Sequence, residues 1–503
     1  MEVPILIVGA GPTGLVLALW LAKRNIPFRL IEKNSGPGQA SRAMVVQART
    51  LEFYRQLGIA GRVIDAGIKM KRIQLREGAR KVAGFSFGDI GVDLTPYPCI
   101  LSLPQDDHER LLVKILEEAG ITIEWNTQLL RFNDDGNRVS ATLSKNGAEE
   151  SADFAYLCGC DGARSTVRQG LGLNFPGGTY DEIFYVADVQ ATGPTIDQQV
   201  NICLSAHTLS LAFPVRSTGM ARLIGIVPME LGDRQNATFD QLRPYVKKQT
   251  DVDVQQVNWF STYHVHHRVA EHFRRGRVFI AGDASHIHSP AGGQGMNTGI
   301  GDAVNLAWKL AAVIREQADA SIFDTYDSER LGFARWLVAT TDRLFATVVG
   351  SGLKSKLVRA VFVPYLAPLL FHLRSIRRGQ FRLVSQIHIQ YRDSALSSGT
   401  AGKISGGDRL PWLSQQDNYK PLESLDWQIH VYGTAGDDLV AFGKKRDMPI
   451  HCFPWSEAAA KAGFSRDAIY LIRPDGHVAL TLADQNIEAI GKFINDHKIG
   501  TRE

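Results

Sequence analysis

The chain has few cysteines and almost no excess of charge. Its 503 residues include five cysteines, and the formal net charge is +4. Five scattered thiols without a framework spacing favour a reducing compartment, so we expect a cytoplasmic protein. A net charge this small for the length gives no extended basic surface, and we expect no nucleic-acid partner.

Long hydrophobic runs are also missing from the N-terminus. The first four residues include no lysine or arginine, and the apolar stretch after them is interrupted by Gly9, Gly11, Pro12 and Gly14. We therefore expect neither a signal peptide nor a membrane span there. Residues 354–378 are apolar with basic flanks, a pattern of membrane-surface helices. Their internal prolines favour helices packed on the domain or a subunit contact, so we expect no integral membrane association and allow for a homodimer.

Metal ligands and redox dithiols are not indicated either. Six of the fourteen histidines fall between residues 264 and 288, but they lack carboxylate or cysteine companions at ligand spacing, and we expect no metal. Cys158 and Cys160 end an apolar run and are interpreted as small half-buried residues. The C-terminal hundred residues contain no Cys-x-x-Cys, so dithiol chemistry is not expected there.

The N-terminus carries instead a strand, a glycine-rich turn and a helix. Residues 3–8 predict a buried strand, and residues 9–14 follow with the sequence Gly-Ala-Gly-Pro-Thr-Gly. A second predicted strand, 28–31, ends in Glu32. This order is typical of a dinucleotide-binding βαβ unit, in which the helix N-terminus holds a pyrophosphate and the carboxylate holds ribose hydroxyls. A glycine-rich turn in some other α/β unit is the alternative.

Two further strands are predicted to end in an aspartate. The apolar runs 154–158 and 277–281 lead to Asp161 and Asp283, each next to a glycine. A glycine-rich loop then opens a helix near Asn297, where free N–H groups suit a phosphate or a polarised carbonyl. Together with the N-terminal turn, these strand ends imply one extended cofactor lying across a single sheet.

Two polar residues outside these motifs are candidates for the same ligand. Arg42 lies in a loop that enters a predicted helix and would clamp a pyrophosphate through two hydrogen bonds, although a surface salt bridge explains it as well. Gln105 lies at the start of another predicted helix, where its amide reaches a ligand or caps the helix.

The pattern along the chain divides it into three parts. Residues 1–175 and 276–400 are expected to form one discontinuous α/β domain, with a helical segment at 303–400. Residues 176–275 alternate apolar and polar side chains, which predicts an antiparallel sheet that covers the cofactor's reactive end and builds the substrate pocket. Residues 401–503 predict a small α/β domain.

In order and spacing, these motifs resemble the class A flavoprotein aromatic monooxygenases of the para-hydroxybenzoate hydroxylase type. The motifs are the 9–14 turn with Glu32, the 161–168 segment and the 282–297 segment, and the resemblance extends from residue 3 to about 480. It is strongest to the branch of phenol, hydroxyphenylpropionate and polyketide hydroxylases. The resemblance implies an α/β fold with an FAD-binding Rossmann-like domain of the glutathione-reductase type, an α+β antiparallel-sheet substrate domain, and a thioredoxin-like C-terminal domain.

The resemblance also implies which residues bind a tightly held, non-covalent FAD. Asp283 would bind the ribityl hydroxyls, and the helix N-terminus after Pro290 would face the isoalloxazine and stabilise negative charge at its N1–C2 carbonyl. The full expected set is Gly9, Gly11, Pro12, Thr13, Gly14, Glu32, Lys33, Arg42, Gln105, Asp161, Gly282, Asp283, Pro290, Gly293, Gly295, Met296 and Asn297.

The implied reaction is hydroxylation of a phenolic or polycyclic aromatic ring with NAD(P)H and O2, through a flavin C4a-hydroperoxide. No second glycine fingerprint is present, so NADPH or NADH is expected to bind transiently, and a two-Rossmann Baeyer–Villiger enzyme is disfavoured. The Trp-x-Trp-x-Ile signature of tryptophan halogenases is missing. The alternatives are an FAD-dependent oxygenase or reductase acting on a non-aromatic ring, and a non-catalytic FAD-binding protein.

No motif identifies the base that would deprotonate a phenol. His207, His264 and His266 are candidates because they lie in the expected substrate domain. Each is also explained as an ordinary surface or packed histidine.

Overall fold

The fold is described from a computed structural model of residues 4–38, 43–78, 80–204, 209–216, 219–289, 293–349, 370 and 372–500. Its first body is a six-stranded sheet with the strand order β18-β19-β12-β1-β2-β8. All neighbours in it are parallel except β18, which is antiparallel to β19. The strands are β1 (Ile5–Val8), β2 (Phe28–Ile31), β8 (Ile123–Glu124), β12 (Tyr156–Gly159), β18 (Arg274–Arg275) and β19 (Val278–Ile280).

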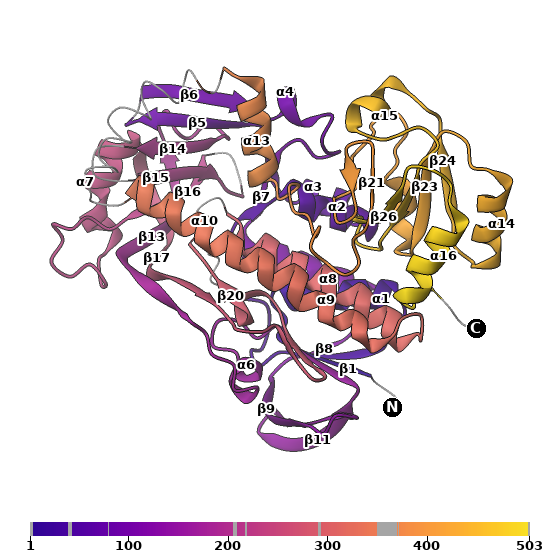
Figure 1. Ribbon diagram of the computed structural model, residues 1–503. Coiled ribbons are helices and arrows are strands. Elements are labelled where there is room, and N and C mark those ends of the chain that lie inside the picture. Colours follow the sequence, from indigo (N-terminus) through magenta and orange to yellow (C-terminus); the bar gives the residue numbers. More distant parts are fainter. Residues whose placement is uncertain are drawn as a thin grey trace.

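Helices cover this sheet because its central strands β1, β12 and β19 are apolar and buried throughout, as expected of parallel strands that are covered on both faces. Helix α1 packs against both α8 and α5, and the buried Trp20 lies in the resulting core. Figure 1 shows the long α8 running through the middle of the molecule. The helices of this body are α1 (Pro12–Lys23), α5 (Gln105–Glu118), α6 (Thr166–Gly170) and α8 (Gly295–Ile314).

Two small sheets flank the first body. An antiparallel meander of β9, β10 and β11 follows α5, and a second sheet has the order β3-β7-β4. The second sheet is accompanied by short helices that connect it to the rest of the chain. The elements are β3 (Val45–Val46), α2 (Ala48–Gln56), α3 (Ala60–Asp65), β4 (Ile68–Met70), α4 (Gly88–Gly91), β7 (Ile100–Ser102), β9 (Thr127–Asp134), β10 (Val139–Lys145) and β11 (Ala148–Phe154).

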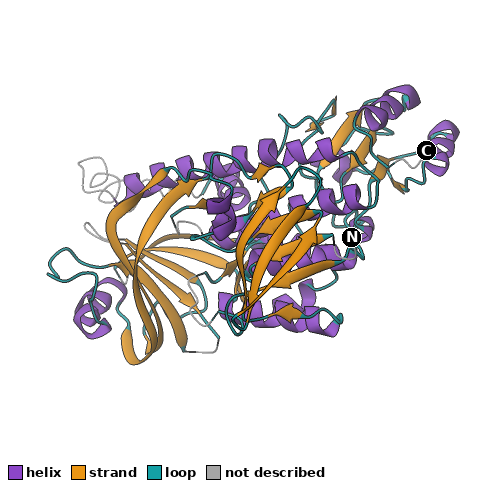
Figure 2. Cartoon of the chain, turned by 90° about the horizontal axis from the view of Figure 1, so that it is seen from below, coloured by secondary structure: helices purple, strands orange, loops and turns teal. Residues whose placement is uncertain are grey.

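The second body is an eight-stranded, mostly antiparallel sheet with the order β20-β17-β13-β16-β15-β14-β5-β6. Figure 2 shows it beside the six-stranded sheet, with α7 at its outer end. It takes in β5 and β6 from the range 1–175 as well as strands from 176–275, so it draws on residues beyond the predicted substrate domain. The elements are β5 (Arg72–Glu77), β6 (Arg80–Ser86), β13 (Gly177–Thr192), β14 (Val200–Leu204), β15 (Leu209–Pro214), β16 (Met220–Ile226), α7 (Phe239–Thr250), β17 (Asp253–Val269) and β20 (His286–Ile287).

The described residues that follow α8, as far as residue 384, are mostly helical and include a π-helical stretch. The elements are η2 (Ala320–Phe323), α9 (Asp324–Tyr326), the π-helical η3 (Asp327–Leu331), α10 (Gly332–Val349) and α13 (Arg374–Val384). Most of the apolar 354–378 segment lies outside the described residues. Within the described part of the chain, no helix has the length and apolar character needed to cross a membrane.

The C-terminal body is a four-stranded mixed sheet with the order β24-β23-β25-β26, in which only β23 and β24 are parallel. Its helices lie around the sheet, at the yellow end of the chain in Figure 1. The elements are β21 (Thr400–Ala401), β22 (Ile404–Ser405), η5 (Lys420–Ser424), β23 (Gln428–Tyr432), α14 (Asp437–Lys445), β24 (Ile450–Phe453), α15 (Glu457–Ala462), β25 (Ile469–Ile472), β26 (Val478–Leu482) and α16 (Ile487–Asp496). The predicted α/β class is confirmed, whereas the three-domain division stays a prediction.

Candidate functional site

Three strand ends that carry predicted motifs meet at one edge of the six-stranded sheet. The strands β1, β12 and β19 are neighbours, and their register places Val8 beside Gly159 and Gly159 beside Ile280. The chain that leaves each strand therefore turns at the same level. This edge brings together the 9–14 turn, Asp161 and Asp283, which lie far apart in the sequence.

The glycine-rich turn after β1 is fixed by close backbone contacts. Gly9 has φ +105°, a conformation that side chains disfavour. A Cβ at Gly14 would lie 1.9 Å from the carbonyl oxygen of Gly9, so helix α1 can approach the strand only with glycine there. A Cβ at Gly11 would meet no described protein atom within 4 Å, so this glycine is exposed to an approaching ligand. Helix α1 begins at Pro12, and its N-terminus suits a pyrophosphate.

The Glu32 carboxylate is held against the glycine-rich turn. Its Oε2 accepts a hydrogen bond from the Ala10 N–H (2.9 Å), and its Oε1 accepts from the Asn34 backbone N–H (3.0 Å) and side-chain amide (2.6 Å). A carboxylate has lone pairs beyond these bonds, so it can still accept from ribose hydroxyls. The neighbouring Lys33 is exposed.

The Gly282–Asp283 corner is packed onto helix α1. Gly282 has φ +63°, and a Cβ there would lie 2.4 Å from the Thr13 hydroxyl oxygen. A Cβ at Gly299 of α8 would lie 2.5 Å from the same oxygen, so α1, α8 and this corner are in close contact. The Gly282 N–H donates to Asp302 Oδ2 (3.0 Å). Asp283 itself is exposed, at the start of a 3-10 turn.

Arg168 connects the Asp161 and Asp283 corners. Its guanidinium donates to the Ala284 carbonyl oxygen (2.8 Å) and to the Ala163 carbonyl oxygen (2.8 Å), and it lies 3.9 Å from the centre of the Phe175 ring. Burial raises the pKa of the Asp161 carboxyl. The sequence interpretation did not assign a role to Arg168, although the residue follows the Asp161 motif directly.

Asn297 fixes the turn at the start of helix α8. Its Oδ1 accepts from the Gln47 N–H (2.9 Å) and the Thr50 hydroxyl (2.8 Å), and its Nδ2 donates to the carbonyl oxygens of Val45 (2.8 Å) and Gly293 (3.0 Å). The side chain is 1% exposed. Its predicted contact with a ligand would therefore come from the backbone N–H, while the amide holds the loop in place.

The other predicted cofactor contacts are partly accessible or lie outside the described residues. Gly295 and Met296, at the start of α8, are half-buried. Gln105 donates to Glu109 Oε1 (2.8 Å), and Glu109 Oε2 accepts from the Gly38 N–H (2.9 Å). Burial raises the pKa of Glu109, a residue that the sequence interpretation missed. Three predicted residues lie outside the described part of the chain: Arg42, His207 and Pro290.

A different histidine from those predicted lies next to the start of α8. His264 is exposed on β17, and His266 hydrogen-bonds the Thr179 hydroxyl at 2.7 Å. In contrast, Nε2 of His288 is 3.7 Å from the position of a Cβ on Gly295. Burial lowers the pKa of His288 to about 4. Its Nδ1 donates to the Ser289 carbonyl oxygen (2.8 Å), so Nε2 carries the lone pair of a neutral imidazole.

The chemistry of this edge fits a dinucleotide. It provides two helix N-termini, a turn whose glycines allow close backbone approach, and carboxylates at two strand ends. Within the described residues, no group of three or more His, Cys, Asp and Glu side chains could hold a metal. An extended ligand with a diphosphate and hydroxyl groups, such as FAD, would contact every part of the edge.

Comparison with known proteins agrees with this geometry. The model of the FAD binding domain family matches residues 2–341. The chain is 33% identical to 6-methylpretetramide 4-monooxygenase of Streptomyces rimosus, over 94% of this chain and 90% of that protein. It is 31% identical to pentachlorophenol 4-monooxygenase of Sphingobium chlorophenolicum, over 70% of this chain and 66% of that protein.

A solved structure of similar architecture has been described with its ligands. It is a ternary complex of aklavinone-11 hydroxylase with FAD and aklavinone, with a TM-score of 0.80, 25% sequence identity, and 99% of each chain covered. The cofactor and enzyme class expected from the sequence are therefore confirmed. The chain belongs to the FAD binding domain family and is a flavin-dependent aromatic monooxygenase.

Proposed function

We propose that the enzyme hydroxylates a polycyclic phenolic substrate, using O2 and NADPH or NADH, at an FAD held along the edge where β1, β12 and β19 end. The observation that carries this proposal is the register of these strands, which places three motifs from distant parts of the sequence at one level. Relatives named for oxidising 6-methylpretetramide and pentachlorophenol support a phenolic ring as the substrate class.

The proposed binding mode assigns one part of FAD to each part of the edge. The pyrophosphate lies at the N-terminus of α1 above Gly11, and Glu32 accepts from the adenosine ribose. Asp283 accepts from the ribityl hydroxyls, and the N-terminus of α8 at Gly295 lies against the isoalloxazine. Bound FAD supplies hydride acceptance and oxygen activation, which no side chain of the protein can perform.

The protein's own contribution is to orient the substrate and keep water away from the flavin. Two arginines connect the eight-stranded sheet to the FAD-binding body, one in the turn after β15 and one in β16. Arg216 pairs with Asp106 at the start of α5 (2.7 Å) and with Asp188 of β13 (2.8 Å). Arg222 is fully buried, pairs with Asp188 (2.6 Å), and donates to the Ala43 carbonyl oxygen (3.4 Å).

Away from these ion pairs, the surface between the two bodies is apolar. A buried cluster joins the β3-β7-β4 sheet to the eight-stranded sheet, with members such as Met44, Val45, Ile100, Val200 and Val215. Val45, a member of this cluster, lies 3.0 Å from the position of a Cβ on Gly293, so the cluster extends to the turn proposed to face the isoalloxazine. Apolar packing at this turn suits an aromatic substrate with several rings better than a small charged one.

The remaining assignments rest on simpler observations. The chain has one glycine fingerprint, so the nicotinamide donor is proposed to bind transiently. All five cysteines are free, which supports a cytoplasmic location. The C-terminal sheet, with its parallel β23–β24 pair, supports a thioredoxin-like domain. We also propose that the protein assembles as a homodimer.

Replacing Asp283 with alanine tests the proposed site. The variant should retain less FAD than the wild type and consume NAD(P)H without forming product. Asp240→Ala, at an exposed salt bridge on α7, is the matched control and should behave as the wild type. Substrates are found by screening phenols and polycyclic aromatics for stimulated NADPH or NADH oxidation and a product heavier by one oxygen atom. Unchanged flavin retention and turnover in Asp283→Ala would contradict the proposal.

A further inference from the structure

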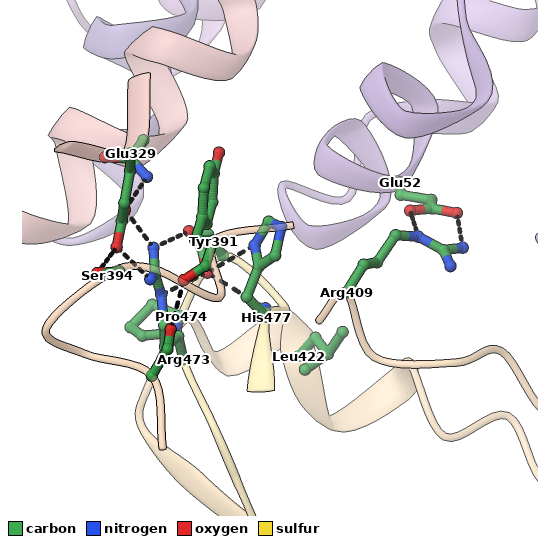
Figure 3. A network of polar contacts seen from close by, with 12 residues as sticks. Glu52, Glu329, Tyr391, Ser394, Arg409, Leu422, Arg473, Pro474 and His477 are labelled. Carbon is green, nitrogen blue, oxygen red and sulfur yellow. Dashed lines mark hydrogen bonds and ion pairs between the residues drawn. The ribbon is translucent and has the colours of Figure 1, made fainter. Parts of the chain in front are cut away.

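The C-terminal body is joined to the FAD-binding body by ion pairs that are fully buried. Arg473, directly after β25, donates to Glu329 Oε1 (2.6 Å) and Oε2 (2.9 Å). Asp475 Oδ2 also accepts a hydrogen bond from Nη2 of the Arg473 guanidinium (2.7 Å). The Arg473 and Glu329 side chains are 0% exposed. Figure 3 shows Glu329 and Arg473 between the helices of the FAD-binding body and the C-terminal strands.

In the π-helical η3, Glu329 is followed by Arg330, which contacts helix α8 on the side of the proposed site. Glu329 and Arg330 are adjacent in η3, and π-helical turns are often found at functional sites. Whereas Glu329 receives Arg473, Arg330 donates to Asp302 Oδ1 (2.6 Å) and to the Thr298 carbonyl oxygen in the first turn of α8 (3.0 Å). Neighbouring side chains of one short segment thus contact the C-terminal body and helix α8.

Asp302 completes the connection to the proposed flavin edge. Its Oδ2 accepts from the Gly282 N–H (3.0 Å) and from His286 Nε2 (2.7 Å). Burial alone would raise the pKa of Asp302, but Arg330 and His286 outweigh it and lower the pKa below its ordinary value. The carboxylate is therefore charged when it holds the backbone that carries Asp283.

A second set of contacts connects the C-terminal body to the turn that opens α8, where the isoalloxazine is proposed to lie. Arg49 of α2 donates to the Asp475 carbonyl oxygen (2.7 Å), and Glu52 of α2 accepts from Arg409 (2.6 Å and 3.0 Å), which Figure 3 also shows. Between Arg49 and Glu52 on the same helix, Thr50 donates to the side chain of Asn297. Helix α2 thus lies between the C-terminal body and the turn that opens α8.

Buried ion pairs are weak sources of stability, because well-packed apolar residues often serve as well. Their defined geometry is better suited to fixing positions. We propose that the C-terminal body positions the flavin: Arg473 acts through Glu329, Arg330 and Asp302 on the Gly282 backbone, and so sets the place of Asp283. Arg473 is in this sense a positioning residue. The inference rests on the proposed function, because it takes Asp283 as a contact of the ribityl chain.

The test compares two arginines near the junction in the FAD-loaded full-length enzyme. Arg473→Met removes the buried contact to Glu329, and the dissociation constant of FAD should rise about tenfold. The visible absorption bands of the bound flavin should shift, and less product should form per NAD(P)H consumed. Arg473→Lys keeps the charge without the two-pronged geometry and should lie between the wild type and Arg473→Met. Arg392→Met removes a half-exposed pair with Asp408 and should change none of these readouts.

A double-mutant cycle separates positioning from general loosening. The effects of Arg473→Met and Asp302→Asn on FAD affinity should be less than additive, because both act on the Gly282 corner. The effects of Arg473→Met and Glu32→Gln should add, because Glu32 lies at the adenosine end. Additivity in both cycles would overturn the proposal. If Arg473→Met does not fold, Arg473→Lys takes its place in the cycles.

The same measurements distinguish a wrong positioning role from a wrong flavin site. If Asp283→Ala weakens FAD binding but neither Arg473 variant alters the affinity or the flavin spectrum, the positioning role is wrong and the site stands. If Asp283→Ala leaves FAD binding unchanged, the site is wrong, and the inference is overturned with it.

Discussion

Glu329 should be the side chain on which the buried junction depends most. It accepts two hydrogen bonds from Arg473 and one each from Lys309 (2.9 Å), Asn305 (2.6 Å) and Ser394 (2.7 Å). Glu329→Gln keeps the shape but removes the charge, and it turns an N–H₂ group toward these donors. Removal of one member of a buried ion pair costs about 3–5 kcal/mol, and we expect a loss of this size.

Part of that loss should depend on pH. Burial lowers the pKa of Lys309 to about 8, and Glu329 partly offsets the effect of burial. Without the Glu329 charge the amine should stay neutral in the folded variant, while it is protonated in the unfolded chain. The unfolded variant then binds one more proton than the folded variant, so the variant's free energy of unfolding increases as the pH rises. In the wild type, Lys309 is protonated in both states below about pH 8, so it gives the free energy of unfolding no pH dependence there. The penalty should therefore grow by about 1.4 kcal/mol for each unit below pH 8.

Urea unfolding at fixed excess FAD, at several values from about pH 6 to about pH 9, measures this penalty. The double variant Lys309→Met/Glu329→Gln should lose the pH dependence, since the amine is gone. Glu457→Gln, in an exposed pair with Lys461, is the control and should unfold as the wild type does. A penalty below about 1 kcal/mol, or one equal at pH 6 and pH 8, would refute this reasoning.

Three other results are expected. Gly11→Ala should leave thermal unfolding of the apoprotein unchanged but weaken FAD binding about tenfold or more, since the methyl group meets only the ligand; equal FAD affinity would contradict the proposed pyrophosphate position. Arg168→Met breaks one buried and one partly buried hydrogen bond and should cost about 1–3 kcal/mol in thermal unfolding, whereas Arg466→Met, at an exposed pair, should leave thermal unfolding unchanged. Although burial opposes the shift, ion pairs with arginine lower the pKa values of Asp302 and Glu52. Their stabilisation is therefore complete above about pH 4 and decreases as the pH falls from there toward the lowered pKa values. Release of FAD in urea, followed by flavin fluorescence, should need less urea at about pH 3 than at about pH 5, and an equal midpoint at both would refute the assignment.

The parts of the site that the sequence predicted are those that local backbone geometry determines. A glycine at φ +105° directly after a buried strand, or an aspartate at a strand end, leaves a short pattern that can be interpreted without knowing the fold. The neighbourhood of β1, β12 and β19 followed from the same patterns, because parallel strands of one sheet present their carboxyl ends together. The α/β class was predictable for this reason.

The supporting contacts were not predictable, because they join residues far apart in the chain. Arg473 and Glu329 are 144 positions apart, and Arg409 and Glu52 are 357 apart. The sequence around Glu329, Asp327-Ser328-Glu329-Arg330, is polar and is typical of an exposed helical turn, so it gives no sign that this charge is buried and paired. The contribution of β5 and β6 to the eight-stranded sheet was missed for a related reason: strand pairing depends on tertiary contacts that periodicity does not reveal.

The glycines of the motifs and the charged residues that surround them have different roles at the site. Gly9, Gly14 and Gly282 allow the backbone to approach a ligand, but a glycine cannot fix its own position because it has no side chain to pack. The rigidity must come from neighbours, and here Asp302 and Arg168 bond the Gly282–Ala284 turn directly. Because Asp302 is paired with Arg330, next to the Glu329 that receives the C-terminal body, accuracy at the flavin edge depends on residues that contact no ligand. This dependence explains why the motifs alone identify the cofactor, whereas the placement of the ring requires the whole chain.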